Sequence, residues 1–108
     1  MANMAKTVKE VLTATKWILE NIGWCQYIYI RYDRENRPES FCLLGAIKMV
    51  VAPDEIKKEA IQAIEDAIAY QTDNWHNRCS VFNDDLGTYK EDVVKVLKKA
   101  ITQQEERS

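Results

Sequence analysis

The chain has 108 residues, of which 46% are hydrophobic and 30% are charged. This length and composition predict a single domain, residues 1–108, with its own apolar core, and they exclude a disordered chain. The formal net charge of -2 does not favour binding to a long nucleic acid, because such proteins usually carry a basic excess.

Charge is uneven along the chain. Residues 54–85 hold eight acidic and three basic side chains, whereas residues 86–101 hold four basic and two acidic ones. An acidic segment such as residues 54–85 is usually a solvated helix face. The alternative is an acidic patch that docks on a basic surface of a partner.

The cysteines predict a reducing environment. Cys25, Cys42 and Cys79 are odd in number, so any internal pairing leaves a free thiol. Residues 1–6 lack the apolar segment of a secretory signal. The longest nearly apolar run, 41–52, is too short to span a bilayer. We therefore expect a cytoplasmic protein with free thiols and no membrane association.

The first helix is predicted to begin after Thr7, because Thr7 and Glu10 have the spacing of a capping box. Asn21 and Gly23 can end it, and residues 1–6 are expected to fray. Its apolar side chains recur every three or four positions, which is typical of a helix with one buried face. They are Val8, Val11, Leu12, Ile18, Leu19 and Ile22.

Residues 24–33 favour a strand, because they are rich in aromatic and β-branched side chains and lack helical spacing. In this strand Ile28 and Ile30 share one face. A lone strand leaves its backbone groups unpaired. We therefore expect either a hairpin with residues 37–41 or a strand from another chain. Pro38 argues against a continuing central strand.

Residues 41–51 are apolar almost throughout, which predicts a helix in the middle of the domain with Ser40 as its cap. Gly45 costs this helix about 1 kcal/mol relative to alanine. We therefore expect Gly45 to let another segment approach closely. Cys42 is expected to be a buried packing residue.

Pro53 is predicted to begin a longer helix over residues 54–71. Its buried stripe consists of Ile56, Ala60, Ile64, Ala67 and Ile68.

Residues 79–82 are expected to form a short helical turn. The last helix is predicted from Thr88 and Glu91, which have capping-box spacing, with Gly87 supplying backbone freedom just before them. Residues 102–108 are expected to fray. The predicted fold is α+β and mostly α, with four helices around the central apolar helix and a small β-hairpin or single strand near residues 25–41.

Cys42, His76 and either Asn83 or Asp84 have the residue types of a nucleophile, a base and an orienting group. The apolar surroundings of Cys42 argue against this arrangement, because buried thiols are more often inert. Cys25, Cys42, Cys79 and His76 have the residue types of a zinc site, yet only His76 and Cys79 are closely spaced. We therefore expect neither catalysis nor a metal.

Asn83, Asp84 and Asp85 offer three adjacent oxygen ligands, but they lack the alternating pattern of a calcium loop. We favour local capping, in which Asn83 or Asp84 accepts backbone hydrogen bonds at a turn or at the start of the apolar helix.

The segment around residues 24–37 is the most suggestive surface. Arginine grips phosphate and aromatic rings stack on bases, so this region has the residue types of a nucleotide site. Interleaved Asp33, Glu35 and Glu39 cancel its charge, which disfavours a long polyanion more than a small ligand. The alternative is that the aromatic rings pack inward and the arginines decorate a turn. The expected binding residues are Trp24, Tyr27, Tyr29, Arg31, Arg34, Arg37, His76 and Asn83, beside Tyr32.

Two motifs resemble an uncharacterised family of small bacterial and phage domains. They are Phe41-Cys42-Leu43-Leu44-Gly45-Ala46-Ile47 and Phe82-Asn83-Asp84-Asp85-Leu86-Gly87-Thr88. Phe82 stands where the family pattern usually has tryptophan. The resemblance covers residues 24–101 and strengthens the predicted fold. The residues expected to have structural roles are Cys42, Gly45, Phe82, Asp84, Gly87 and Thr88. The resemblance also implies a phage or bacterial accessory protein.

We therefore expect a small non-enzymatic binding or inhibitor protein, encoded by a phage or mobile element, that acts on a host defence or regulatory component. The partner is a protein, and the aromatic strand also allows a homodimer. One alternative is a domain that sequesters a small signalling nucleotide through Tyr29, Arg31 and Arg34. Another is an enzyme that uses Cys42 and His76. We expect no cofactor.

Overall fold

The computed structural model describes residues 4–72 and 79–107 and shows the mostly α, α+β fold that the sequence predicts. The elements are α1 (Val8–Asn21), β1 (Ile30–Tyr32), β2 (Pro38–Phe41), α2 (Leu43–Met49), α3 (Asp54–Thr72), α4 (Cys79–Asp84) and α5 (Lys90–Arg107).

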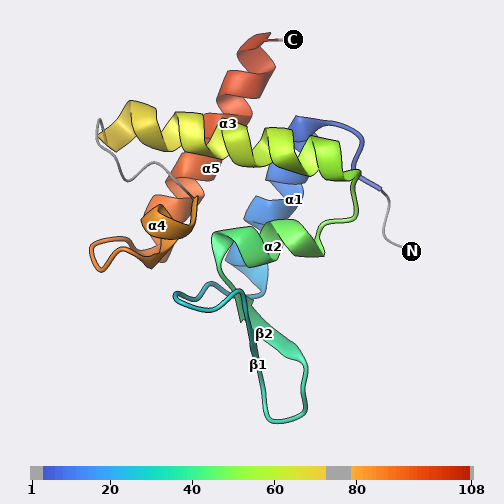
Figure 1. The fold of residues 1–108 in the computed structure, drawn as a ribbon, viewed down its shortest axis with the longest axis vertical. Coiled ribbons are helices and arrows are strands. Elements are labelled where there is room, and N and C mark those ends of the chain that lie inside the picture. The colour runs from blue at the N-terminus through green and yellow to red at the C-terminus, as the bar shows by residue number, and fades with distance from the viewer. Residues whose placement is uncertain (1–3, 73–78, 108) are drawn as a thin grey trace.

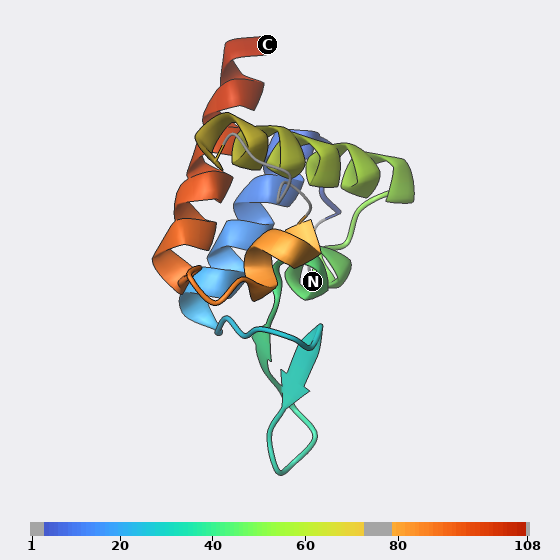
Figure 2. The ribbon, with the colours of Figure 1, turned by 60° about the vertical axis from the view of Figure 1, so that its left-hand side comes forward.

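The helices form a body from which the hairpin projects. α1 and α5 lie side by side, α3 crosses both, and the β1–β2 hairpin extends away from the helices (Figures 1 and 2). α2 contacts α1, α3, α4 and β2, so it joins the body to the hairpin. None of the described helices has the length and apolar character needed to cross a membrane.

α1 forms where it is predicted, except that Ile22 lies at its C-cap and is 47% exposed rather than part of the buried face. The Oγ1 of Thr7 accepts a hydrogen bond from the N–H of Glu10 at 3.1 Å and caps the helix. The buried face carries Val11, Leu12 and Leu19, all fully inaccessible to solvent. The segment before α1 is anchored rather than frayed at Ala5, because the N–H of this buried residue donates to the Val51 oxygen at 2.7 Å.

β1 is shorter than predicted. Only Ile30–Tyr32 pairs with β2, in an antiparallel hairpin with a bulge between Arg31 and Tyr32. Trp24 makes an isolated parallel bridge to Phe41 on the other side of β2. Tyr27 has a φ of 73°, a left-handed conformation that no strand contains. The predicted strand over residues 24–33 is therefore wrong in extent, whereas the hairpin alternative is confirmed.

α2 begins at Leu43, and its cap is Cys42 rather than the predicted Ser40. Ser40 and Phe41 lie in β2. The N–H of Phe41 donates to the Gly23 oxygen at 3.0 Å, and the Phe41 oxygen accepts from the N–H of Cys25 at 2.9 Å. Because this pairing holds Phe41 in an extended conformation, the helix starts two residues later than its apolar pattern predicts.

α3 buries its predicted stripe almost completely, with Ala60, Ile64, Ala67 and Ile68 inaccessible to solvent. α4 is the predicted helical turn, extended to Asp84. It buries Phe82 in the core.

α5 begins one residue later than predicted. The carboxylate of Asp92 accepts from the N–H of Tyr89 at 2.8 Å, so the reciprocal bond of a capping box involves Tyr89 and Asp92 instead of Thr88 and Glu91. Thr88 is buried instead. Gly87 has no positive φ, so the predicted need for its backbone freedom is wrong. At its other end, α5 continues to Arg107, through the residues expected to fray.

Candidate functional site

Residues 24–29, which we call the strap, connect α1 to β1 and cover the start of α2. The strap lies directly on Gly45. A Cβ at Gly45 would overlap the carbonyl oxygen of Tyr29 and lie 2.7 Å from its carbonyl carbon. The close approach predicted for Gly45 is therefore confirmed, and the strap backbone is the segment that approaches.

Asn83 of α4 holds the strap to α2. Its Oδ1 accepts from the indole Nε1 of Trp24 at 2.7 Å and from the N–H of Leu43 at 3.1 Å. Its Nδ2 donates to the Cys25 oxygen at 3.1 Å and to the Asp84 Oδ1 at 3.0 Å. The bond to Leu43 satisfies the start of α2, the capping role that the sequence favours over a cation site.

Two further contacts fix the strap against the end of α4. The Nε2 of Gln26 donates to the carbonyl oxygens of Asn83 and Asp85, at 3.0 and 2.9 Å. The N–H of Tyr27 donates to the Asp84 Oδ1 at 2.8 Å. These bonds hold Tyr27 in its left-handed conformation. No signal in the sequence indicates this role of Gln26, because a glutamine carries no preference for such a site.

The strap presents aromatic and aliphatic side chains to solvent. Tyr27 is 65% exposed, Ile28 51% and Tyr29 52%, and Tyr32 of β1 is 54% exposed. We call Tyr27, Ile28 and Tyr29, which line one hollow, the aromatic face. Side chains of this size are usually buried in part by the protein that carries them. Consecutive exposed residues of this type form a candidate interaction surface.

A hollow of about 360 Å³ lies beside this face. We call it the strap hollow, and its lining consists of Tyr27, Ile28, Tyr29, Cys42, Ser80 and Asp84. Its lining combines two aromatic rings, apolar side chains and a carboxylate.

Cys42 lines the hollow, and its surroundings disfavour a reactive thiol. The residue is buried, and its Sγ accepts from the N–H of Gly45 at 3.3 Å. Burial raises the pKa of the Cys42 thiol, so the nucleophilic thiolate is disfavoured. Burial likewise raises the pKa of Cys79. His76, the predicted base, lies outside the described residues. Within the described residues, no three His, Cys, Asp or Glu side chains gather as a metal site.

The predicted arginines do not join the tyrosines. None of Arg31, Arg34 and Arg37 lines the strap hollow. Arg37 is engaged at the hairpin turn, where its Nε lies 3.2 Å from Asp33 and its Nη2 lies 2.9 Å from Glu35. Hydrogen bonds from the backbone and side chain of Arg37 and from the Glu35 N–H lower the pKa of Asp33.

The structure thus divides the predicted binding residues into groups. Tyr27 and Tyr29 line the hollow. Trp24 of the strap and Asn83 of α4 are instead hydrogen-bonded to each other and hold the strap against α4. Arg31 and Arg34 are exposed. The sequence prediction missed Ile28 and Ser80, which only the fold brings to the hollow.

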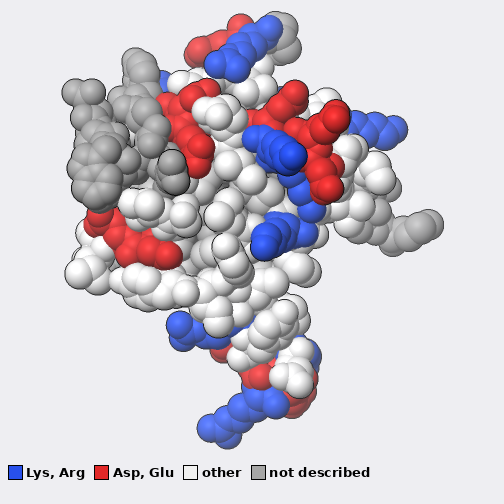
Figure 3. All heavy atoms as spheres, viewed as in Figure 1, with Lys and Arg blue, Asp and Glu red and all other residues white. Residues whose placement is uncertain are grey.

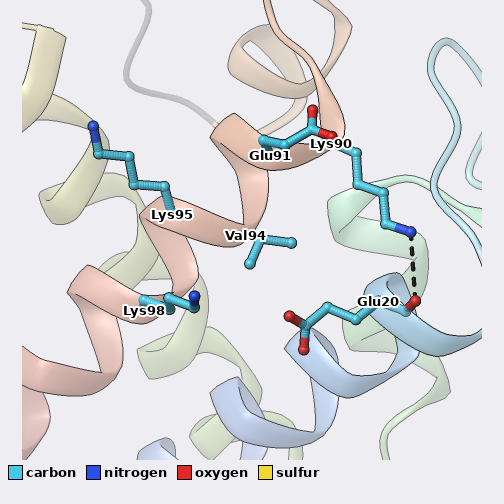
Figure 4. Close-up of a pocket in the computed structure, with 6 residues that line it drawn as sticks. All are labelled: Glu20, Lys90, Glu91, Val94, Lys95 and Lys98. Atoms are coloured by element: carbon cyan, nitrogen blue, oxygen red, sulfur yellow. Dashed lines mark hydrogen bonds between the residues drawn. The ribbon is translucent and has the colours of Figure 1, made fainter.

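Further hollows lie elsewhere on the described part of the chain, and two of them are larger than 300 Å³. One, of about 480 Å³, lies between the end of α1 and the start of α5. Its lysines lie on α5, and the Nζ of Lys90 donates to the backbone oxygen of Glu20 at 3.4 Å (Figure 4). The hydrogen bond from Lys16 lowers the pKa of the Glu20 carboxyl. The other is an apolar groove of about 310 Å³ that includes Trp17 and Met49.

Comparison with known proteins identifies a family but no activity. The model of a family of unknown function, DUF6197, matches residues 4–103. This match agrees with the resemblance to an uncharacterised family. No curated protein and no solved structure matches the chain.

Proposed function

Since the chain belongs to the DUF6197 family, whose function is unknown, we propose a function from its surface: it is a small non-enzymatic protein that binds another protein through the aromatic face. Three features support this proposal. They are the backbone conformation of Tyr27, the open edge of β1 and the projection of the hairpin from the body.

Tyr27 carries the proposal. A left-handed conformation favours glycine or asparagine, and a bulky residue there costs about 1 kcal/mol. Burial of the ring does not offset this cost, because Tyr27 is 65% exposed. Backbone strain of this kind is common where a side chain is held for function. The tyrosine ring is therefore positioned for a contact outside the chain.

The edge of β1 offers backbone groups to a partner. The N–H of Cys42 donates to the Tyr29 oxygen at 3.0 Å, so these residues form a hydrogen-bonded pair of the hairpin. Such pairs alternate along an antiparallel ladder, which makes Ile30 and Phe41 a non-hydrogen-bonded pair. The N–H and C=O of Ile30 therefore point away from β2. A partner strand can pair with them, beside the aromatic face.

The hairpin is also accessible. It extends from the helical body, with its turn far from α3 and α5 (Figures 1 and 2). A projecting element of this shape reaches into a partner's groove without hindrance from the body. A second copy of this chain is one partner that fits an open strand edge.

The setting that we propose is the cytoplasm of a bacterial host, with the protein encoded by a phage or mobile element. In this setting it acts as an inhibitor of a host defence or regulatory component. The resemblance of the two motifs supports this setting. Sequestration of a small nucleotide receives less support, because the arginines do not line the hollow that contains the tyrosines.

The test is affinity capture from a bacterial lysate, with chemical crosslinking and quantitative mass spectrometry. Tyr27→Asn keeps the left-handed backbone favourable, and Tyr29→Gln removes the second ring. We expect each variant to lose at least about tenfold in recovery of the same partner, equivalent to about 1.4 kcal/mol. A second copy of the chain as partner appears as a dimer in native mass spectrometry.

Trp17→Gln is the matched control, because Trp17 is an aromatic residue of α1 that is 58% exposed and lines the separate apolar groove. This variant is expected to recover the partner as the wild type does. Equal recovery by all variants, or no specific partner and no dimer, contradicts the proposal.

A further inference from the structure

We propose that the strap hollow binds the cationic end of a lysine or arginine side chain of the protein partner. This inference rests on the proposed function, and it adds the chemistry of the contact. It follows from the carboxylate of Asp84, whose Oδ2 has no partner among the described residues, from the two aromatic rings beside it, and from a lining in which the described chain places no basic residue.

Asp84 supplies the negative charge. Its Oδ1 accepts from the N–H of Tyr27 and from the Nδ2 of Asn83, at 2.8 and 3.0 Å. These bonds fix the orientation of the carboxylate, and its Oδ2 has no partner among the described residues. Asp84 is half-buried, so water screens it less than it screens a surface carboxylate. A carboxylate fixed in this way favours a cation in the hollow.

The tyrosines supply the second attraction. A cation over an aromatic ring is stabilised by the negative face of the π system. Tyr29 already shows this property, because the Nζ of Lys48 lies 4.2 Å from its ring centroid. Ile28 and Cys42 add apolar lining. The methylene groups of a lysine or arginine side chain pack on such a surface while the charged end reaches a carboxylate.

The surroundings favour a basic side chain over a phosphate. Within residues 4–72 and 79–107, no lysine or arginine lines the hollow, and a phosphate group would meet the charge of Asp84. Acidic side chains lie over α4 in the face shown in Figure 3. The volume of about 360 Å³ is at the lower end of ligand sites, which suits one side chain better than a large cofactor.

The experiment is an NMR titration of the full chain with n-butylammonium and n-butylguanidinium, which reproduce the ends of the two basic side chains. 1-Pentanol is the neutral probe of similar size. We expect saturable shifts of the amides of Tyr27, Tyr29, Ser80 and Asp84 with both cations. Asp84→Asn keeps an oxygen for the Tyr27 N–H and removes the charge. It is expected to weaken binding of the cations by about fivefold.

Asp85→Asn is the matched control. It removes the same charge from the neighbouring exposed residue, which does not line the hollow, and we expect binding to be unchanged. Lys48→Met is expected to strengthen cation binding, because it removes a positive charge from the ring of Tyr29. Equal shifts with 1-pentanol, an equal loss in both Asp variants, or no saturable shift overturns the inference.

This failure is distinguishable from failure of the proposed function. In one outcome, partner capture depends on Tyr27 and Tyr29, but the hollow binds no cation and Asp84→Asn captures the partner normally. The proposed binding function then stands, and only the binding of a basic side chain of the partner in the hollow is excluded. If capture is independent of the tyrosines, the proposed function fails, whatever the cations do.

Discussion

Asn83 has hydrogen-bonding groups that fit its position as few side chains do. The site needs an acceptor for Trp24 and Leu43 and a donor for Cys25, all within one buried side chain. An amide offers an acceptor with two lone pairs and two donor hydrogens. Asn83 is 1% exposed, so water does not replace any bond that is lost.

We predict that Asn83→Ala lowers the free energy of unfolding by about 3 kcal/mol, because it leaves several buried polar groups without a partner. Equilibrium urea unfolding, followed by tryptophan fluorescence, measures the change. Asn21→Ala is the control, since the side chain of this exposed residue makes one hydrogen bond among the described residues, to the Trp17 oxygen. Its expected change is below about 0.5 kcal/mol. Similar losses in the two variants would falsify the structural role of Asn83.

At the scale of the elements, α2 and the strap are fitted to each other. α2 is only seven residues long, so its own hydrogen bonds give it little stability. Its start depends on the thiol of Cys42 and the amide of Asn83. Its surface at Gly45 has room for the strap only because this residue lacks a side chain.

We predict that Gly45→Ala destabilises the protein by about 3 kcal/mol or more, although alanine favours a helix by about 1 kcal/mol. The added methyl group overlaps backbone atoms of Tyr29, which cannot rotate away as a side chain does. Gly87→Ala is the matched control. Its Cβ would lie 3.3 Å from the Oδ1 of Asp85, an exposed side chain that can turn into solvent, and Gly87 has no positive φ.

Thermal unfolding measures both glycine variants. We expect a lower midpoint for Gly45→Ala and little change for Gly87→Ala. An unchanged midpoint for Gly45→Ala contradicts the close packing of the strap on α2.

The helices were predictable because their signals are local. Val11, Leu12 and Leu19 repeat with the helical period, and Thr7 caps its own helix. The strap was not predictable in this way, because its path depends on contacts between residues about 57 positions apart. The hydrogen bond between Tyr27 and Asp84 is one such contact. Aromatic residues there favour a strand locally, but tertiary bonds hold Tyr27 in another conformation. For the candidate site, the sequence identified Tyr27 and Tyr29 but not the hollow between them.

At the scale of the whole molecule, the body and the hairpin differ in how they are held. The helices share a continuous core that includes Leu19, Ile47, Ile64 and Leu97. The end of the hairpin lies outside that core, and every residue from Arg34 to Glu39 is exposed. Asp33 holds the turn by accepting from the N–H groups of Glu35 and Arg37, at 2.8 and 3.0 Å.

We therefore predict that the hairpin opens without unfolding the body. In native-state hydrogen exchange, the amides of Glu35 and Arg37 should have protection factors at least about 100-fold lower than those of Leu12 and Leu97, equivalent to about 2.8 kcal/mol. Asp33→Ala should accelerate exchange in the hairpin alone. Asn83→Ala, in contrast, should accelerate exchange in the helices, because it lowers the stability of the whole fold.

The outcome bears on how a partner is bound. If the hairpin amides exchange as slowly as those of α1, the hairpin belongs to the same cooperative unit as the body, and a partner must fit its present shape. If they exchange fast and independently, the hairpin can adjust to a partner strand along β1 at little cost to the body. The strap, anchored by Asn83 and Gln26, then supplies the rigid part of the surface and the hairpin the adaptable part.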